Sequence, residues 1–346
     1  MIKTTYYQDL TKMNTFGMKV KARCFMEYDS VADLVDIEFE ELARPVLHIG
    51  AGSNLLFTDD FKGTILHSTI NFIEILEEAS DVLVSVGAGV VFDDLCAWAA
   101  KEGLWGVENL SYIPGEVGAS AVQNIGAYGV EVKDVIRKVY CYDTVEEEFV
   151  NFDVEDCEYG YRDSFFKDPE VKGRYIVTHV VFALSRTPQP KLDYGHLKDA
   201  VMTAAGDAPL TPAMIRKVII KVRKEKLPEP SVKGSAGSFF KNPVIDVEHF
   251  ARIEAAAKAE FGADYKVPHY DLPDGTVKVP AAWMIEQCGW KGKRSGGAAV
   301  WDKQPLVIVN HTGEAYPEEI VGLEKRIIAS VKTKFNVELH PEVEHI

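Results

Sequence analysis

The chain has 346 residues with 38 basic and 53 acidic side chains, so its formal net charge at pH 7 is −15. Hydrophobic residues make up 47% of the sequence and charged residues 26%, which is typical of a soluble globular protein and excludes a disordered chain, a fibre and a small disulfide-rich scaffold. The length predicts two or three domains, and the excess of acidic side chains argues against a general nucleic-acid-binding protein.

Strand and helix signals alternate along the chain, which favours a mixed α+β architecture. The predicted strands cover residues 46–49, 82–86, 135–143, 145–152, 175–184 and 337–343. The predicted helices cover residues 92–103, a segment that starts at 211–212, and residues 247–261 and 317–333. Thr211 is the expected cap of the second of these helices, and Pro228 and Pro230 end it and mark a domain boundary.

The cysteines form no C-x-x-C pair, so they predict neither a zinc site nor a redox motif. They are Cys24, Cys96, Cys141, Cys157 and Cys288. Scattered cysteines of this kind are typical of core residues in a reducing compartment. No apolar run approaches the roughly 18 residues of a membrane span, and the N-terminus has no signal-peptide pattern. We therefore expect a cytoplasmic protein with no metal site.

Two glycine-rich segments flank one predicted strand–helix unit. The first glycine segment, residues 50–54, follows the strand 46–49, and the second glycine segment covers residues 113–129. Glycine lets the backbone approach a ligand closely, and successive N–H groups can bind a pyrophosphate. Each segment alone is typical of a turn, and the first lacks the third glycine of the dinucleotide-binding fingerprint. Together they favour one large phosphate-bearing cofactor, which lies flat against the backbone of the second segment.

A basic segment follows in the chain. Residues 216–241 include eight basic and two acidic side chains, a net charge of +6 that leaves −21 for the rest of the chain. Part of this charge belongs to the solvated face of an amphipathic helix, but basic residues continue to the turn 234–238. An anionic substrate such as a sugar diphosphate is expected to be attracted there. Ser238 has no G-x-S-x-G motif around it, which argues against a hydrolase nucleophile.

Six short motifs occur in a distinctive order. They are Asn14-Thr15-Phe16, Gly50-Ala51-Gly52-Ser53-Asn54, Ile113-Pro114-Gly115, Gln123-Asn124-Ile125-Gly126-Ala127-Tyr128-Gly129, Tyr161-Arg162-Asp163-Ser164 and Gly237-Ser238-Phe239-Phe240-Lys241-Asn242-Pro243. In combination they resemble the UDP-N-acetylenolpyruvoylglucosamine reductases, flavoenzymes that make UDP-N-acetylmuramate for bacterial peptidoglycan, and the resemblance covers nearly the whole chain. Asp193-Tyr194-Gly195 and the stretch 269–292 resemble the longer of the two forms of that family, which closes a tyrosine-bearing loop over the substrate.

The resemblance implies an FAD-binding fold of the vanillyl-alcohol-oxidase (PCMH) type. It divides the chain into a first FAD-binding subdomain at 1–72, a second at 73–226 plus 336–346, and an α+β substrate-binding domain at 227–335. Non-covalent FAD is expected, because covalent relatives carry a histidine in the first glycine segment. The implied FAD contacts are Gly50, Gly52, Ser53, Asn54, Leu55, Ile113, Pro114, Gly115, Gly118, Ala119, Asn124, Gly126 and Ala127.

The implied reaction is the NADPH-dependent reduction of UDP-N-acetylglucosamine enolpyruvate through FAD. A hydride adds to the vinyl carbon C3 of the substrate, and negative charge develops at C2 and the carboxylate. Arg162 matches the arginine that stabilises this charge, since a guanidinium suits a carboxylate. Ser238 matches the donor of the proton to C2, and Glu342 matches a third catalytic residue, whose protonation state the sequence leaves open.

Seven residues are implied to contact the substrate. Tyr194 and Tyr270 flank the uridine diphosphate, and the phosphate and sugar contacts are Arg223, Lys226, Asn242, Lys278 and Gln304. Pro280 and Ala282 depart from the pattern of the family after Lys278, and Glu116 places an acid in the second glycine segment. We expect Glu116 to affect cofactor affinity or redox potential without abolishing binding. The expected partners are the substrate and NADPH, with no nucleic acid, membrane or obligate protein partner.

Two alternatives stay open at this point. The first is another flavin-dependent oxidase or dehydrogenase of the same fold, whose reduced flavin reacts rapidly with oxygen and needs no UDP-sugar. The absence of a histidine in the first glycine segment and the motif around Ser238 count against it. The second is a nucleotide- or flavin-binding regulator without turnover, and the presence of Arg162, Ser238 and Glu342 counts against that.

Overall fold

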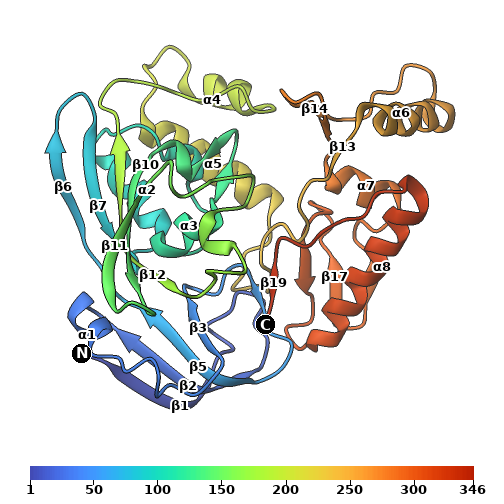
Figure 1. The fold of residues 1–346 in the computed structure, drawn as a ribbon. Coiled ribbons are helices and arrows are strands. Elements are labelled where there is room, and N and C mark those ends of the chain that lie inside the picture. Colours follow the sequence, from blue (N-terminus) through green and yellow to red (C-terminus); the bar gives the residue numbers. More distant parts are fainter. The chain divides into compact units, whose positions relative to one another are not determined.

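The computed structural model describes all 346 residues, and the chain folds as two compact units (Figure 1). The first unit contains residues 1–10, 20–52 and 60–225, and the second contains residues 11–19, 53–59 and 226–346. The last boundary lies just before Pro228 and Pro230, where the sequence predicts one. The finer division into two FAD-binding subdomains and a substrate-binding domain remains a prediction.

The first unit contains a four-stranded sheet of order β1-β2-β5-β3. The strands are β1 (Lys3–Asp9), β2 (Lys21–Tyr28), β5 (Phe61–Ser68) and β3 (Val46–Ile49), and helix α1 (Val31–Val35) follows β2. Strand β5 pairs in parallel with both β2 and β3, whereas β1 is antiparallel to β2. Because β3 ends at Ile49, the first glycine segment begins at the end of a strand, as predicted.

The same unit contains a five-stranded antiparallel sheet of order β11-β10-β12-β7-β6. The strands are β11 (Glu148–Asp153), β10 (Ile136–Asp143), β12 (Tyr175–Leu184), β7 (Val82–Gly87) and β6 (Ile73–Glu78). Strand β12 is buried along most of its length because strands cover both of its edges and one hydrophobic core covers a face. A nearly continuous apolar run of this kind is what a fully buried strand requires.

Helices α2 (Phe92–Lys101) and α3 (Val117–Gln123) share the core of this sheet. Their buried residues include Leu95, Ala99 and Ala121. A separate cluster joins α4 (Leu197–Ala205) to α5 (Pro212–Lys226). The short elements of the unit are η1 (Glu108–Leu110), η2 (Val132–Asp134), η3 (Phe165–Lys167) and the paired strands β8 (Gly126–Ala127) and β9 (Val130–Glu131).

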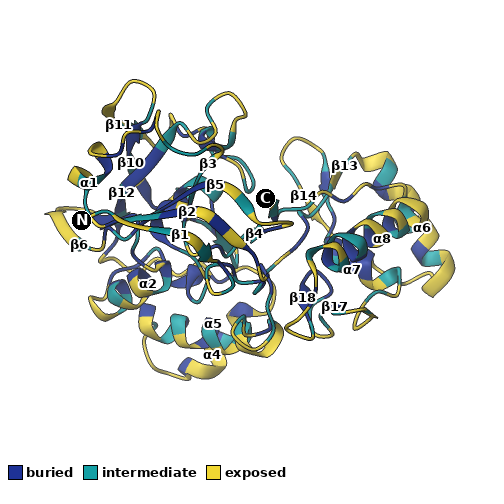
Figure 2. Cartoon of the chain, turned by 90° about the horizontal axis from the view of Figure 1, so that it is seen from below, coloured by how far each residue is buried: buried dark blue, intermediate teal, exposed yellow.

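The second unit is built around helix α8 (Pro317–Phe335), whose inner face is buried and whose outer face is exposed (Figure 2). Its other elements are α6 (Val247–Phe261), α7 (Ala281–Gln287), the sheet of β13 (Val244–Ile245), β15 (Val277–Lys278) and β14 (Tyr270–Asp271), the sheet of β16 (Arg294–Ser295), β17 (Ala298–Val300) and β18 (Ile308–Asn310), and the parallel pair β4 (Leu55–Leu56) and β19 (Glu344–His345). None of the helices in the structure combines the length and the apolarity needed to cross a membrane.

Most predicted elements are confirmed, and two predictions are wrong. The predicted strand 337–343 is absent, because Pro341 has no N–H to donate and the segment makes only isolated backbone contacts before β19 begins at Glu344. The second glycine segment does not lie flat, because its middle is α3. A Cβ atom at Gly118 would lie only 2.9 Å from the Cβ atom of Ala88, the residue that follows β7. Glycine therefore allows α3 to pack closely against Ala88.

Candidate functional site

The two glycine segments contact each other in the first unit. A Cβ atom at Gly50 would lie 3.1 Å from Oε2 of Glu116 and 3.2 Å from Cβ of Ala119. Gly52 and Gly115 have φ angles of 62° and 127°, which L side chains rarely adopt. Glycine leaves the backbone bare at these two positions, and such a backbone fits a phosphate-bearing cofactor.

Arg162 lies in a tight turn in which Gly160 and Asp163 exchange backbone hydrogen bonds. Its φ angle is 55°, a conformation that costs a non-glycine residue of order 1–3 kcal/mol and that often marks a functional residue. Its Nη2 donates to the carbonyl of Gly126 at 2.6 Å, and its Nη1 donates to the carbonyl of Asn124 at 3.3 Å. The second glycine segment thus holds the guanidinium of this predicted catalytic residue in place.

Asn124 connects the second glycine segment to the turn that carries Arg162. It is fully buried and ends α3 with a φ angle of 49°. Its Nδ2 donates to the carbonyl of Gly160 at 2.7 Å and to Oε2 of Glu131 at 3.2 Å. The Asn124 side chain is engaged within the protein, and it positions the Arg162 turn.

Two predicted substrate contacts also lie beside the second glycine segment. The Tyr194 ring stands edge-on to the Tyr128 ring, with centroids 6.1 Å apart, and Cβ of Tyr194 lies 3.5 Å from the Cβ position of Gly129. Nε of Arg223 donates to the carbonyl of Tyr112 at 3.1 Å. Burial lowers the pKa of Arg223. The first unit therefore places Arg162, Tyr194 and Arg223 around this segment.

Sequence reasoning missed the residue that organises the start of the second glycine segment. Asp93, in the first turn of α2, accepts hydrogen bonds from the backbone N–H of Tyr112 and from both terminal nitrogens of Arg216. Burial raises the pKa of Asp93, but Arg216 and the Tyr112 N–H outweigh it and leave the pKa below the ordinary 3.8. Arg216 is therefore paired and Arg223 is half-buried, so neither belongs to the exposed basic patch that the sequence predicts.

We expect Asp93→Asn to lower the free energy of unfolding by about 1–3 kcal/mol, because it removes a charged partner from the half-buried Arg216. The pKa of Asp93 is lower in the folded protein than in the unfolded chain. The stabilisation by the Asp93–Arg216 pair is therefore present above the unfolded-state pKa of Asp93 and is lost as the pH falls through its folded-state pKa. Urea unfolding at neutral pH and below about pH 4 measures both effects. Asp94→Asn, on the exposed side of the same helical turn, is the control, and equal losses in the two variants would contradict the assignment.

The second unit brings together Ser238 and Glu342. Ser238 follows Gly237, whose φ angle is 70°, and its backbone pairs with Val307. The N–H of Glu342 donates to the carbonyl of Phe239 at 2.8 Å, so Glu342 lies on the segment next to Ser238. The buried Phe239 side chain anchors this arrangement. Two of the three predicted catalytic residues are thus neighbours.

Part of the first glycine segment lies beside Glu342. Nδ2 of Asn54 donates to the carbonyl of Glu342 at 3.1 Å, and the N–H of Glu344 donates to the carbonyl of Asn54 at 3.0 Å. The carbonyl of Ser53 accepts from Oγ1 of Thr15 at 3.4 Å, and Leu55 starts β4. The predicted FAD contacts Ser53, Asn54 and Leu55 therefore belong to the second unit, whereas Gly50 and Gly52 belong to the first.

Gln304 lies beside the backbone partner of Ser238, and Lys226 contacts Trp301, both in the second unit. Gln304 begins the turn that the N–H of Val307 closes at 3.0 Å, and Val307 is the backbone partner of Ser238. The carbonyl of Lys226 accepts from Nε1 of Trp301 at 3.0 Å.

Tyr270 and Lys278 lie on one small sheet of the second unit, and Asn242 lies two positions before its third strand, β13. Tyr270 on β14 is the register partner of Lys278 on β15, and Oδ1 of Asn242 accepts from the N–H of Ala281 at 2.9 Å. Pro280 caps α7 and Ala282 lies in its first turn, so the two departures from the family pattern begin a regular helix. Lys278 keeps its place in the strand before it.

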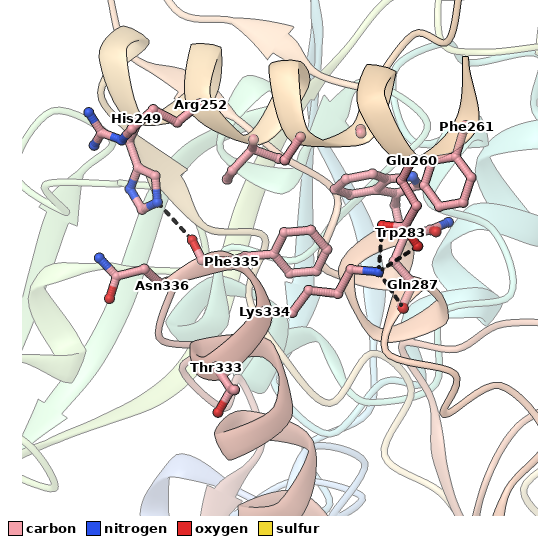
Figure 3. Close-up of a pocket in the computed structure, with 13 residues that line it drawn as sticks. His249, Arg252, Glu260, Phe261, Trp283, Gln287, Thr333, Lys334, Phe335 and Asn336 are labelled. Atoms are coloured by element: carbon pink, nitrogen blue, oxygen red, sulfur yellow. Dashed lines mark hydrogen bonds and ion pairs between the residues drawn. The ribbon is translucent and has the colours of Figure 1, made fainter.

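A hollow of about 270 Å³ lies apart from all of these residues, between α6, α7 and the end of α8 (Figure 3). Its polar groups bond to one another: Nζ of Lys334 lies 3.1 Å from Oε2 of Glu260, and Nε2 of His249 lies 2.8 Å from the carbonyl of Phe335. No predicted site residue lines it.

Two sequence families match parts of the chain. Residues 229–346 match the family described as UDP-N-acetylenolpyruvoylglucosamine reductase, C-terminal domain, and residues 23–149 match the FAD binding domain. The crystal structure of UDP-N-acetylenolpyruvylglucosamine reductase from Thermus caldophilus has the same fold, with a TM-score of 0.67 and 22% identity over 100% of this chain and 98% of that chain. The predicted fold class is confirmed.

Full-length relatives are named UDP-N-acetylenolpyruvoylglucosamine reductase. The Bacteroides fragilis protein is 50% identical over 339 residues, which are 97% of this chain and 98% of the relative. The Porphyromonas gingivalis protein is 42% identical over 97% of both chains, and the Chromobacterium violaceum protein is 44% identical over 96% of both. The chain therefore belongs to the UDP-N-acetylenolpyruvoylglucosamine reductase family.

Proposed function

We propose that this protein reduces UDP-N-acetylglucosamine enolpyruvate to UDP-N-acetylmuramate with NADPH and FAD, a step in the synthesis of peptidoglycan precursors. The observation that carries the proposal is the 50% identity over 97% of the chain to a relative that bears the name of this activity. The arrangement of Arg162 in the first unit, and of Ser238 beside Glu342 in the second, supports it.

The two glycine segments are the proposed site of FAD. Their close contact at Gly50 and the positive φ angles of Gly52 and Gly115 support this assignment, because a bare backbone gives a pyrophosphate access to N–H groups. The other proposed contacts are Ser53, Asn54, Leu55, Ile113, Pro114, Gly118, Ala119, Asn124, Gly126 and Ala127. Bound FAD supplies hydride transfer between NADPH and the substrate. The first glycine segment lacks the histidine that covalent relatives carry there, so the proposed binding is non-covalent.

Arg162 is the proposed partner of the substrate carboxylate. Negative charge grows at this carboxylate and at C2 as the hydride adds to C3, and a preorganised cation stabilises that charge. The carbonyls of Asn124 and Gly126 fix the guanidinium in advance, so little reorganisation accompanies the reaction.

Ser238 is the proposed donor of the proton to C2. Its side chain is exposed at the end of a glycine turn, while its backbone is held by Val307. A hydroxyl is a weak acid, so the transfer needs the strongly basic carbanion that forms at C2. Glu342 lies on the adjacent segment and, when protonated, donates a hydrogen bond to the developing enolate.

Seven residues are the proposed contacts of the nucleotide part of the substrate. Tyrosine rings provide flat apolar faces for a base and sugar, and Lys and Arg side chains bind phosphates. The proposed contacts are Tyr194 and Arg223 in the first unit and Lys226, Asn242, Tyr270, Lys278 and Gln304 in the second.

We place the protein in the cytoplasm, because its five cysteines are free thiols, which suits a reducing compartment. The proposed partners are small molecules alone. A net charge of −15 repels nucleic acid, and no step of the proposed reaction requires a second protein.

Steady-state turnover tests the proposal. NADPH oxidation is expected to require the enolpyruvyl UDP-sugar, and the product is expected to be heavier than the substrate by two hydrogens. Oxidation that proceeds with oxygen alone, at a rate that the UDP-sugar does not change, would instead support a flavin oxidase.

A further inference from the structure

A buried ion pair joins strand β5 to the second glycine segment in the first unit. Nε2 of His67, on β5, is 3.0 Å from Oε1 of Glu116, in the second glycine segment. The side chains are only 13% and 11% exposed. The proposed reaction gives neither residue a role, and a buried pair of charges is costly unless it serves one.

Glu116 also contacts the first glycine segment. Its Oε2 lies 3.1 Å from the Cβ position of Gly50, so one carboxylate oxygen bonds to His67 and the other faces the backbone of Gly50. The carboxylate is therefore a spacer between the two segments. It also places a negative charge beside the proposed site of an anionic cofactor, where an uncompensated charge would repel the pyrophosphate.

The groups that face His67 come from two strands, β2 and β3, and from the loop that carries Glu116. Glu27, on β2, places Oε1 3.5 Å from Nδ1 of His67 and also pairs with Lys3 at 3.2 Å. His48, on β3, is buried and lies 2.7 Å from the hydroxyl of Tyr28. Burial and the charge of His67 lower the pKa of His48 to about 3, so His48 is neutral.

The two carboxylates decide the charge of His67. Burial lowers the pKa of His67, but hydrogen bonds and charge interactions with Glu116 and Glu27 outweigh it and raise the pKa above the ordinary 6.5. His67 is therefore a cation at slightly acid pH, and it loses its proton as the pH rises through the raised value.

We propose that the Glu116–His67 pair positions the two glycine segments for FAD, and that the proton on His67 offsets the Glu116 charge so that FAD binds more tightly when His67 is protonated. This inference rests on the proposed function, since it takes the glycine segments to be the FAD site. Glu116 and His67 are positioning residues. They act on FAD through the backbone of the glycine segments and through their own charges, without chemistry on the reacting atoms.

The test measures the dissociation constant of FAD for the full chain, by flavin fluorescence after the bound cofactor has been removed. Wild-type affinity is expected to fall roughly three- to tenfold between about pH 6 and about pH 9, the loss that one coupled proton produces. Glu116→Gln keeps the spacer and removes its charge, so this variant should bind FAD more tightly than the wild type at high pH. Its fall in affinity should move to lower pH, because His67 loses the carboxylate that raises its pKa most.

Two further variants separate charge from structure. His67→Gln leaves the Glu116 charge uncompensated, so its affinity should equal the weak wild-type value of high pH at every pH. Glu27→Gln removes one of the carboxylates that raise the pKa of His67, so the fall in affinity should move to lower pH. His196→Gln, at a fully exposed histidine of the same unit, is the control and should behave as wild type.

The outcomes are distinct. A wild-type chain that binds no FAD at any pH overturns the proposed function and this inference with it. FAD affinity that does not depend on pH in the wild type, or that falls over the same pH range in Glu116→Gln as in the wild type, overturns the inference alone. Thermal unfolding identifies any variant that fails to fold, and the wild-type and Glu116→Gln pH profiles decide the matter even if His67→Gln is lost.

Discussion

Replacing Ser238 with alanine is expected to slow reduction of the enolpyruvyl substrate by about 10²–10⁴-fold, the usual contribution of a positioned proton donor. Reduction of bound FAD by NADPH should stay close to the wild-type rate, because no proton is delivered to C2 in that half-reaction. Since Ser238 is exposed, its backbone pairs with Val307 and the next residue, Phe239, is buried, the substitution should leave the fold intact.

Stopped-flow absorbance of the flavin measures the two half-reactions separately. Ser231→Ala, at an exposed serine seven positions earlier, is the matched control and should leave both rates unchanged. Equal slowing of the two half-reactions in Ser238→Ala would show that the serine supports the site generally and does not donate the proton.

Replacing Arg162 with glutamine is expected to slow the same half-reaction by about 10²–10³-fold, the effect of removing one preorganised group that stabilises developing negative charge. Arg162→Lys should recover only part of this loss. An ammonium keeps the charge but cannot reproduce the fixed fork that donates to the carbonyls of Asn124 and Gly126.

The rate constant at saturating substrate distinguishes the two possible roles of Arg162. A catalytic role lowers that rate constant, whereas a role in binding alone would raise KM and leave it unchanged. Arg137→Gln, at an exposed arginine on β10, is the control for the loss of one positive charge. An Arg162→Gln enzyme with a wild-type rate at saturation would refute the stabilising role.

Strong local signals in the sequence predicted much of the fold. Strand β12 has its predicted bounds because a nearly continuous apolar run of ten residues between polar turns favours a buried strand. Helix α6 begins where Asp246 caps it, with its side chain accepting from the N–H of His249 at 2.6 Å. Helix α3 was missed because Gly118 and the small residues around it resemble a loop until Ala88 packs against them.

The sequence predicts candidate site residues where they form a compact motif, as around Ser238 and Arg162, and their roles stay a prediction. It does not predict contacts between residues that lie far apart in the chain. Asp93 and Arg216 are separated by 123 positions, and His67 and Glu116 by 49, so only the folded chain brings each pair together. In the sequence Asp93 reads as an ordinary acidic residue in the first turn of a helix, and Glu116 reads as an unusual acid without a partner.

The visible spectrum of the purified protein under anaerobic conditions tests the central claim most directly. The oxidised protein should be yellow, lose its colour when NADPH is added, and regain it when UDP-N-acetylglucosamine enolpyruvate follows. A protein that stays colourless with added FAD, or one bleached by NADPH whose colour the enolpyruvyl sugar does not restore, would contradict the proposed reductase.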